Sequence, residues 1–186
     1  MAAAGPSLRA KALAWLALRE HSTHELRTKL VRWAQARGRD AQAEGLDGLL
    51  AALQQAGHLS DARFIESRVQ ARSARLGNVR LELELRRNGV QPDEALRAEL
   101  HASEFARAQA VWARRFGRGQ PGQGGLARDA GAAGGAGRGC PDARAEQARQ
   151  ARFLAGRGFR AETIRRVLGS LPSPQDAPDE PAPGGG

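Results

Sequence analysis

One segment near the middle of the chain restricts the fold more than any other. Gly57 is followed closely by Ser60 and Asp61, the pattern of a helix that ends on a left-handed glycine and of another that begins on a capping serine. An arginine-bearing stretch then runs to Gly77, and a second basic stretch ends at Asn88-Gly89-Val90. The segment predicts short helices joined by tight turns, and it carries no catalytic constellation.

The composition agrees with this pattern. The 186 residues contain no Tyr and are rich in Ala, Leu, Arg and Glu, which favour helix over strand. One segment conflicts with it, because apolar and charged residues alternate strictly from Val79 to Leu85, as in a half-buried strand. Leu, Glu and Arg are helix formers, however, and β-branched residues are scarce here. We therefore predict a helix in this segment as well.

Caps and apolar periodicity predict nine helices in groups of three. Ser22 and Glu25 form a capping-box pattern, in which the serine covers a backbone N–H and the glutamate reaches back. Pro92 is expected to open a short helix that ends near His101, and Ser103 to cap the next one. The prediction is an all-α, elongated array of three tandem three-helix repeats. Its parts are a disordered N-terminus 1–6, repeats 7–57, 58–102 and 103–171, a flexible Gly/Ala-rich insertion 117–143, and a disordered acidic Pro/Gly tail 172–186.

Similar tripeptides recur in the three repeats: Glu25-Leu26-Arg27, Glu84-Leu85-Arg86 and Thr163-Ile164-Arg165. We expect their arginines to share one position within their helices and to form a row. A row of guanidinium groups suits carboxylate or phosphate contacts, whereas a merely solvated face would accept Lys, Glu or Gln equally well. The candidate partner-binding residues are Arg27, Lys29, Arg72, Arg75, Arg86, Arg87, Arg165 and Arg166.

The charge points to an anionic partner. The formal net charge is +9, although acidic residues and no bases occupy the tail, so an acidic protein surface or a nucleic acid is the expected partner. Nearly all the positive charge is arginine in a chain rich in Ala and Gly, a composition that GC-rich coding also produces. The positions of the arginines are therefore better guides than their number.

The sequence contains fragments of enzyme, cofactor and metal motifs, but the residues around them do not match those that such sites require. The glycines of Gly117-Arg118-Gly119-Gln120-Pro121-Gly122 spell G-x-G-x-x-G but follow a helix and include a proline, and no ATP-binding phosphate loop occurs. His21 and His24 lack further metal ligands nearby, and Cys140 is the only cysteine. We expect no cofactor, no metal site and no catalysis. The single cysteine and the lack of a long apolar run predict a cytoplasmic protein with no membrane contact.

In the order and spacing of its motifs, the chain resembles the RecX family of bacterial regulators of recombination. The resemblance rests on Arg19-Glu20-His21-Ser22 with Glu25-Leu26-Arg27-Thr28-Lys29-Leu30, on Gly57-His58-Leu59-Ser60-Asp61-Ala62-Arg63-Phe64, on Glu84-Leu85-Arg86-Arg87-Asn88-Gly89-Val90, and on Arg152-Phe153-Leu154, Arg157-Gly158-Phe159 and Ile164-Arg165-Arg166-Val167-Leu168. It implies tandem three-helix repeats that bind the RecA recombinase filament and restrain its ATPase and strand exchange; some members also bind DNA. The insertion and the acidic tail depart from the family pattern.

The hypothesis is therefore a non-enzymatic, monomeric modulator of a RecA–DNA filament. The alternative is a basic helical protein that binds single- or double-stranded DNA directly, with effects on recombination secondary. The two differ in whether the filament is bound far better than bare DNA or free recombinase.

Overall fold

A computed structural model describes residues 5–117 and 143–170. Within these residues the chain forms helices and turns and no strand, which confirms the all-α prediction. The helices are α1 Leu8–Leu16, α2 Thr23–Gln35, α3 Leu46–Gln55, α4 Asp61–Arg72, α5 Asn78–Arg87, α6 Glu94–Phe116, α7 Ala143–Gly156 and α8 Ala161–Gly169.

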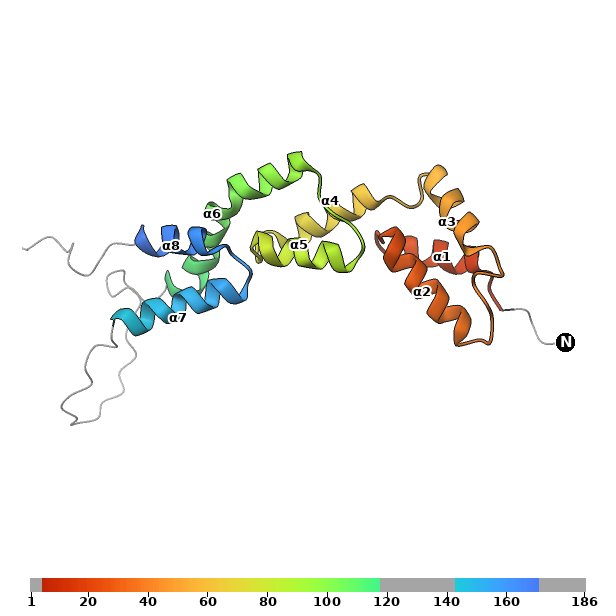
Figure 1. Ribbon diagram of the computed structural model, residues 1–186, viewed down its shortest axis with the longest axis horizontal. Coiled ribbons are helices and arrows are strands. Elements are labelled where there is room, and N and C mark those ends of the chain that lie inside the picture. The colour runs from red at the N-terminus through yellow and green to blue at the C-terminus, as the bar shows by residue number, and fades with distance from the viewer. Residues whose placement is uncertain (1–4, 118–142, 171–186) are drawn as a thin grey trace, which may run out of the picture.

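The helices form an elongated array (Figure 1). Helices α1–α3 make a first unit at one end, α4, α5 and the start of α6 make a second unit in the middle, and the rest of α6 with α7 and α8 makes a third unit at the other end. Each unit has its own apolar core, around Leu26 and Leu50 in the first, Phe64 and Leu85 in the second, and Leu154 in the third. The array is therefore stabilised unit by unit.

Helix α6 corrects the expected boundary between the second and third repeats. The sequence predicted two helices, one opened by Pro92 and one capped by Ser103, but α6 is one helix of 23 residues. Its N-cap is Asp93, whose carboxylate accepts the Leu96 N–H at 2.8 Å. The Ser103 hydroxyl instead donates to the Glu99 carbonyl at 2.9 Å, one turn earlier in the same helix, so it opens no new helix.

Helix α5 resolves the strand-or-helix conflict in favour of helix. Leu81 and Leu85, one turn apart, are buried, whereas Val79 and Leu83 are 53% and 46% exposed. The strict alternation therefore does not separate a buried face from a solvated one, as it would in a strand. Leu81 and Leu85 face the core, whereas Val79 and Leu83 lie on a second, exposed stripe of the same helix.

The joint between the first and second units is made by few contacts. The Ser22 hydroxyl donates to the Asn88 carbonyl at 2.7 Å, and the Thr23 N–H donates to Asp61 Oδ1 at 2.7 Å. Gly89, with φ of 73°, lies so close to His24 that a Cβ there would be 2.6 Å from the His24 Cβ. The turn after α5 thus docks on the N-terminus of α2.

The joint between the second and third units repeats this arrangement one unit further along. The Gly77 and Val79 N–H groups, at the start of α5, donate to the Arg157 and Gly158 carbonyls at 2.9 and 3.1 Å. Gly158, with φ of 82°, lies against Arg80. At both joints, a left-handed glycine after one unit's middle helix packs on the start of the preceding unit's middle helix, because only glycine allows this approach.

A buried polar cluster strengthens the second joint. Glu104 is 1% exposed, and its carboxylate accepts the Asn78 N–H at 2.9 Å and the Thr163 hydroxyl at 2.8 Å. The Arg107 guanidinium donates to Asn78 Oδ1 at 2.5 Å and to the Leu76 carbonyl at 2.9 Å. Burial lowers the pKa of Arg107 from its usual value, against the raising effect of Glu104. The cluster joins α5, α6 and α8.

Several expectations lie outside the described residues: Cys140, the acidic tail 172–186, and all of the predicted insertion except its two ends. Within the described ranges, no helix has both the length and the apolar character needed to cross a membrane.

Candidate functional site

The three recurring arginines do not share one position, so that expectation is wrong. Arg27 lies in the first half of α2 and Arg165 in the first half of α8, whereas Arg86 lies in the last turn of α5. They also belong to different members of their units, since α8 is a third helix and α2 and α5 are middle helices. Arg27 pairs with Asp47, and Arg86 lies 3.9 Å from Glu82. The three are therefore not equivalent positions of the repeats.

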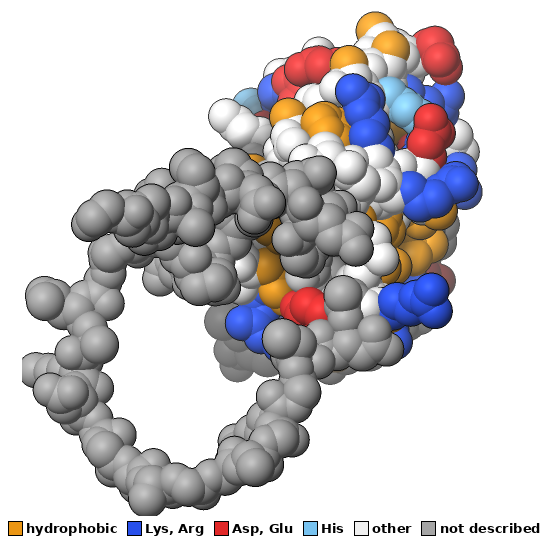
Figure 2. All heavy atoms as spheres, turned by 90° about the vertical axis from the view of Figure 1, so that its left-hand side faces the viewer, with side chains coloured by type: hydrophobic (Ala, Val, Ile, Leu, Met, Phe, Trp, Pro, Cys, Tyr) orange, Lys and Arg blue, Asp and Glu red, His pale blue; other side chains and the backbone are white. Residues whose placement is uncertain are grey.

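The other predicted residues are dispersed as well. The Lys29 ammonium lies 5.0 Å from the centre of the Trp15 ring, and Arg72 is 3.3 Å from Glu84. The Arg166 guanidinium lies 4.2 Å from the centre of the Phe105 ring. Arg75 and Arg87 line two separate pockets, described below. On the face drawn in Figure 2, the Lys and Arg side chains in blue are likewise separated by other side chains.

His21 has a structural position. It is 1% exposed, and its Nδ1 lies 3.0 Å from Glu25 Oε2 without the alignment of a hydrogen bond. The pKa of His21 is lowered from its ordinary value, chiefly by burial and also by the nearby Arg19 and Lys29 charges, against the raising effect of Glu25. Glu25 does not reach back in a capping box; burial opposes its ionisation, but contacts with Arg19 and His21 outweigh this and lower its pKa. The Ser22 half of the box is present, since the Glu25 N–H donates to the Ser22 hydroxyl at 3.0 Å.

A groove of about 370 Å³ lies between α5 and the end of α7. The exposed Val79 and Leu83 form its apolar side, and Arg80 and Arg87 flank them. The Arg80 guanidinium donates to the Gly156 carbonyl at 2.9 Å, which fixes its position. An apolar strip bordered by cations is suited to a protein segment that carries apolar and acidic side chains.

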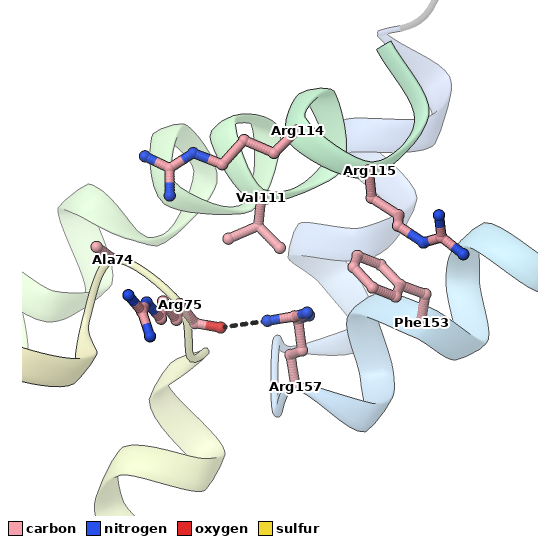
Figure 3. Close-up of a pocket in the computed structure, with 7 residues that line it drawn as sticks. All are labelled: Ala74, Arg75, Val111, Arg114, Arg115, Phe153 and Arg157. Atoms are coloured by element: carbon pink, nitrogen blue, oxygen red, sulfur yellow. Dashed lines mark hydrogen bonds between the residues drawn. The ribbon is translucent and has the colours of Figure 1, made fainter. Parts of the chain in front are cut away.

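A second pocket, of about 280 Å³, lies at the joint between the second and third units (Figure 3). Its cations come from the turn after α4, from α6 and from the turn after α7, and its lining is Ala74, Arg75, Val111, Arg114, Arg115, Phe153 and Arg157. The Arg157 guanidinium donates to the Arg75 carbonyl at 3.4 Å and lies 4.6 Å from the centre of the Phe153 ring. Across residues 5–117 and 143–170, none of the four arginines has a carboxylate partner.

Sequence reasoning named Arg75 but missed the other three arginines of this pocket. Arg114 and Arg115 form a basic pair in the last turn of α6, which is a common arrangement at helix ends. Arg157 follows α7 and looks like an ordinary turn residue. The only sequence signal for this pocket was the spacing of Arg114 and Arg115 three and four residues after Val111, which places the three residues on one face of a helix.

The sequence of the chain is similar to those of known proteins. The family model described as "RecX, third three-helix domain" matches residues 136–168. The chain is 37% identical over 177 residues, 94% of both chains, to the regulatory protein RecX of Ralstonia nicotianae. The chain belongs to the RecX family. A second RecX, from Herminiimonas arsenicoxydans, is 37% identical over 87% of this chain and 91% of the relative.

A solved structure supports the fold of this RecX-family chain. The crystal structure of RecX from Lactobacillus salivarius superposes with a TM-score of 0.60, covering 87% of this chain and 92% of that chain at 16% identity. The likeness at this identity concerns the helical fold. The resemblance stated from the sequence motifs is thus confirmed at the level of the family.

Proposed function

We propose that the protein is a non-enzymatic regulator that binds a RecA–DNA filament and lowers its ATP hydrolysis and strand exchange. Membership in the RecX family supports this, because the relatives carry the name of a regulatory protein. The elongated array would lie along the filament in a groove shared by adjacent protomers. Occupation of that groove would impede closure around ATP or access of the second DNA.

The observation that favours a protein partner is the groove between α5 and α7. Val79 and Leu83 are large apolar side chains left 53% and 46% exposed, and burying them against a partner would remove this surface from water. The flanking Arg80 and Arg87 would pair with acidic side chains of the recombinase. The contacts proposed from the sequence, among them Arg27, Arg86 and Arg165, remain proposals, and these three residues do not line the groove.

The test is single-stranded-DNA-dependent ATP hydrolysis by the cognate RecA, titrated with this protein. Wild type should lower the rate, and the double variant Val79→Ser/Leu83→Ser should need more protein for half inhibition. Partial burial of two apolar side chains contributes about 1–2 kcal/mol, or roughly a tenfold shift in concentration.

Leu18→Ser is the matched control, because Leu18 is 81% exposed and lies in the first unit, away from the groove. It should inhibit as wild type does. Absence of inhibition by the folded wild-type protein would reject the proposed function, and equal loss in both variants would reject the groove as the contact.

A further inference from the structure

The four arginines at the second joint form a cluster of positive charge that solvent can reach. Arg75, Arg114 and Arg115 are exposed and Arg157 is half-buried, and all four line the pocket of about 280 Å³. Within residues 5–117 and 143–170, none of them forms an ion pair with a carboxylate. Like charges gathered in this way repel one another, so carboxylates that reach the pocket are attracted by the whole cluster.

The surface of the pocket favours carboxylates over a flat ring. Its apolar floor is closed, because Val111 is 5% exposed and the centre of the Phe153 ring lies 5.2 Å from that of Phe116 and 4.6 Å from the Arg157 guanidinium. The guanidinium groups lie around this floor and come from α6 and from two turns (Figure 3). Arginine donates paired N–H groups to a carboxylate. Several carboxylates spaced along a chain would therefore contact more of the cluster than one anion would.

The chain itself carries such carboxylates shortly after α8. Residues 172–186 contain Asp176, Asp179 and Glu180 and no lysine or arginine. They also contain several prolines, each of which fixes φ and so reduces the conformational entropy that is lost on docking. Along an extended chain, Asp176 can lie about 10 Å from Asp179 and about 13 Å from Glu180. This spacing allows contacts with guanidinium groups on different sides of the pocket.

The point from which this acidic segment leaves the fold is close enough to the pocket. Helix α8 packs against both α6 and α7, and its last residue is Gly169. The path along the turn and the helix places Gly169 at most about 26 Å from Arg157. From Gly169, an extended chain reaches up to about 23 Å at Asp176 and about 36 Å at Glu180. A tether of this length gives an effective concentration of about millimolar, so weak ion pairs are enough for docking.

We propose that residues 172–186 dock in this pocket of the same molecule, with the carboxylates of Asp176, Asp179 and Glu180 on its guanidinium groups. The docked segment shields the arginines from other acidic ligands. Because the pocket is lined from both the second and the third unit, docking also holds these units together. The proposal goes beyond the proposed function, which concerns the groove between α5 and α7 and a recombinase.

The test is nuclear magnetic resonance of the full chain with a nitroxide on the acidic segment. The label is attached to Ala182→Cys, and Cys140→Ser removes the only natural cysteine. The nitroxide should raise the transverse relaxation rates of the backbone amides of Ala74 and Arg157, relative to the same protein with the nitroxide reduced. Raising salt to about 1 M, where the Debye length is about 3 Å, should lower this enhancement.

Two charge variants locate the contact. The neutral-tail variant is Asp176→Asn/Asp179→Asn/Glu180→Gln, and the pocket variant is Arg114→Gln/Arg115→Gln. Each should lower the relaxation enhancement about twofold, as expected when two or three exposed ion pairs are lost from a balanced docking equilibrium.

The matched control is Arg9→Gln/Arg32→Gln, which removes the same charge as the pocket variant from exposed positions on α1 and α2. It should leave the enhancement as in wild type. Circular dichroism of the pocket variant and of this control should match wild type, since all four side chains are exposed. An enhancement that is equal in wild type, in both charge variants and at high salt would come from the tether alone and would overturn the proposal.

A mixing experiment tests whether docking occurs within one molecule. Isotope-labelled protein without nitroxide is mixed with spin-labelled protein that carries no isotope. No relaxation enhancement is expected in this mixture. Enhancement there would assign the acidic segment to a second copy of the chain and overturn docking within the same molecule.

A fluorescent decaglutamate peptide tests the shielding. It should bind the neutral-tail variant about twofold more tightly than wild type, since a competitor that fills the pocket half of the time halves the apparent affinity. In the presence of Arg114→Gln/Arg115→Gln, the tail substitutions should no longer change the affinity. Equal binding by wild type and the neutral-tail variant, or an equal gain with and without the pocket arginines, would reject shielding at this pocket. None of these outcomes depends on ATPase inhibition.

Discussion

Gly77 shows how one residue determines the fit between units. A Cβ at this position would lie 2.2 Å from the Gly158 carbonyl oxygen and 2.2 Å from the Phe159 nitrogen. These are backbone atoms, so the methyl group of alanine could be accommodated only if the joint opened. The backbone of Gly77 itself is ordinary, with φ of −78°, so the requirement for glycine comes from the neighbouring unit.

We therefore expect Gly77→Ala to lower the free energy of unfolding by about 1–3 kcal/mol, the usual cost of overpacking, as measured by urea denaturation. Gly48→Ala is the control, because Gly48 lies within α3 with nothing within 4 Å of its added Cβ. That change should raise stability by up to about 1 kcal/mol through helix propensity. Equal effects of the two substitutions would contradict the close contact at the joint.

His21 gives a pH dependence at the same scale. Burial lowers its pKa below the ordinary 6.5, so between that value and its folded pKa the unfolded chain binds more protons than the folded one. Stability is then fully present above about pH 6.5 and declines as the pH falls below it. The thermal midpoint of wild type should drop between pH 7.5 and pH 5.5 more than that of His21→Gln. Parallel curves for the two proteins would refute this origin.

At the scale of elements, α6 is the member that fixes the second joint. Its Glu104 carboxylate accepts hydrogen bonds from the start of α5 and from Thr163 of α8. Arg107, one turn further, reaches the Ser73 and Leu76 carbonyls in the turn before α5. A break near Ser103, as the sequence suggested, would separate these two residues. A continuous helix keeps them on one face, because residues three or four apart lie side by side.

Glu104→Ala should lower the free energy of unfolding by about 1–3 kcal/mol, since it leaves the buried Asn78 N–H without its acceptor. Guanidinium denaturation followed by circular dichroism measures the loss. Glu99→Ala serves as the comparison: Glu99 is exposed on the same helix, and its removal should change stability by no more than about half a kcal/mol. A Glu104 variant as stable as the Glu99 variant would show that the cluster contributes little.

At the scale of the whole molecule, separate cores joined by small contacts predict uneven cooperativity. The first unit meets the second through a few hydrogen bonds, an Arg63–Glu20 ion pair and the Gly89–His24 contact, whereas the second and third share α6. In arrays of this kind, stability is a sum of unit terms and nearest-neighbour terms. The first unit should therefore open without the third.

Leu26 is fully buried in the first core, so Leu26→Ala should destabilise that unit by about 2–5 kcal/mol. Hydrogen exchange should show faster exchange in α1–α3, while amides of α6 and α8 keep their protection. Leu154→Ala, which truncates a fully buried leucine of the third core, should give the reverse pattern. Uniform loss of protection in both variants would indicate one cooperative unit instead.

The sequence by itself determined the features that depend on a few neighbouring residues. Gly57 and Gly89 end helices in the left-handed conformation, the Ser60 hydroxyl accepts the Arg63 N–H, and α5 is a helix. Helix propensity, caps and glycine turns act over one or two turns of chain, so they can be read without knowledge of the fold. The family followed from the order and spacing of the same motifs.

Only the tertiary structure decided which side chains meet. Arg75, Arg114 and Arg157 are far apart in sequence and share a pocket because the turn after α4 docks on the end of α7 beneath α6. Glu104 is buried because it contacts Asn78 of α5, which precedes it in the sequence, and Thr163 of α8, which follows it. The residues next to Glu104 in the sequence do not predict this burial. The expected equivalence of Arg27, Arg86 and Arg165 was wrong because similar tripeptides occur at different places in different helices of the units. The position of a residue within its unit depends on how the helices pack, which a short motif does not determine.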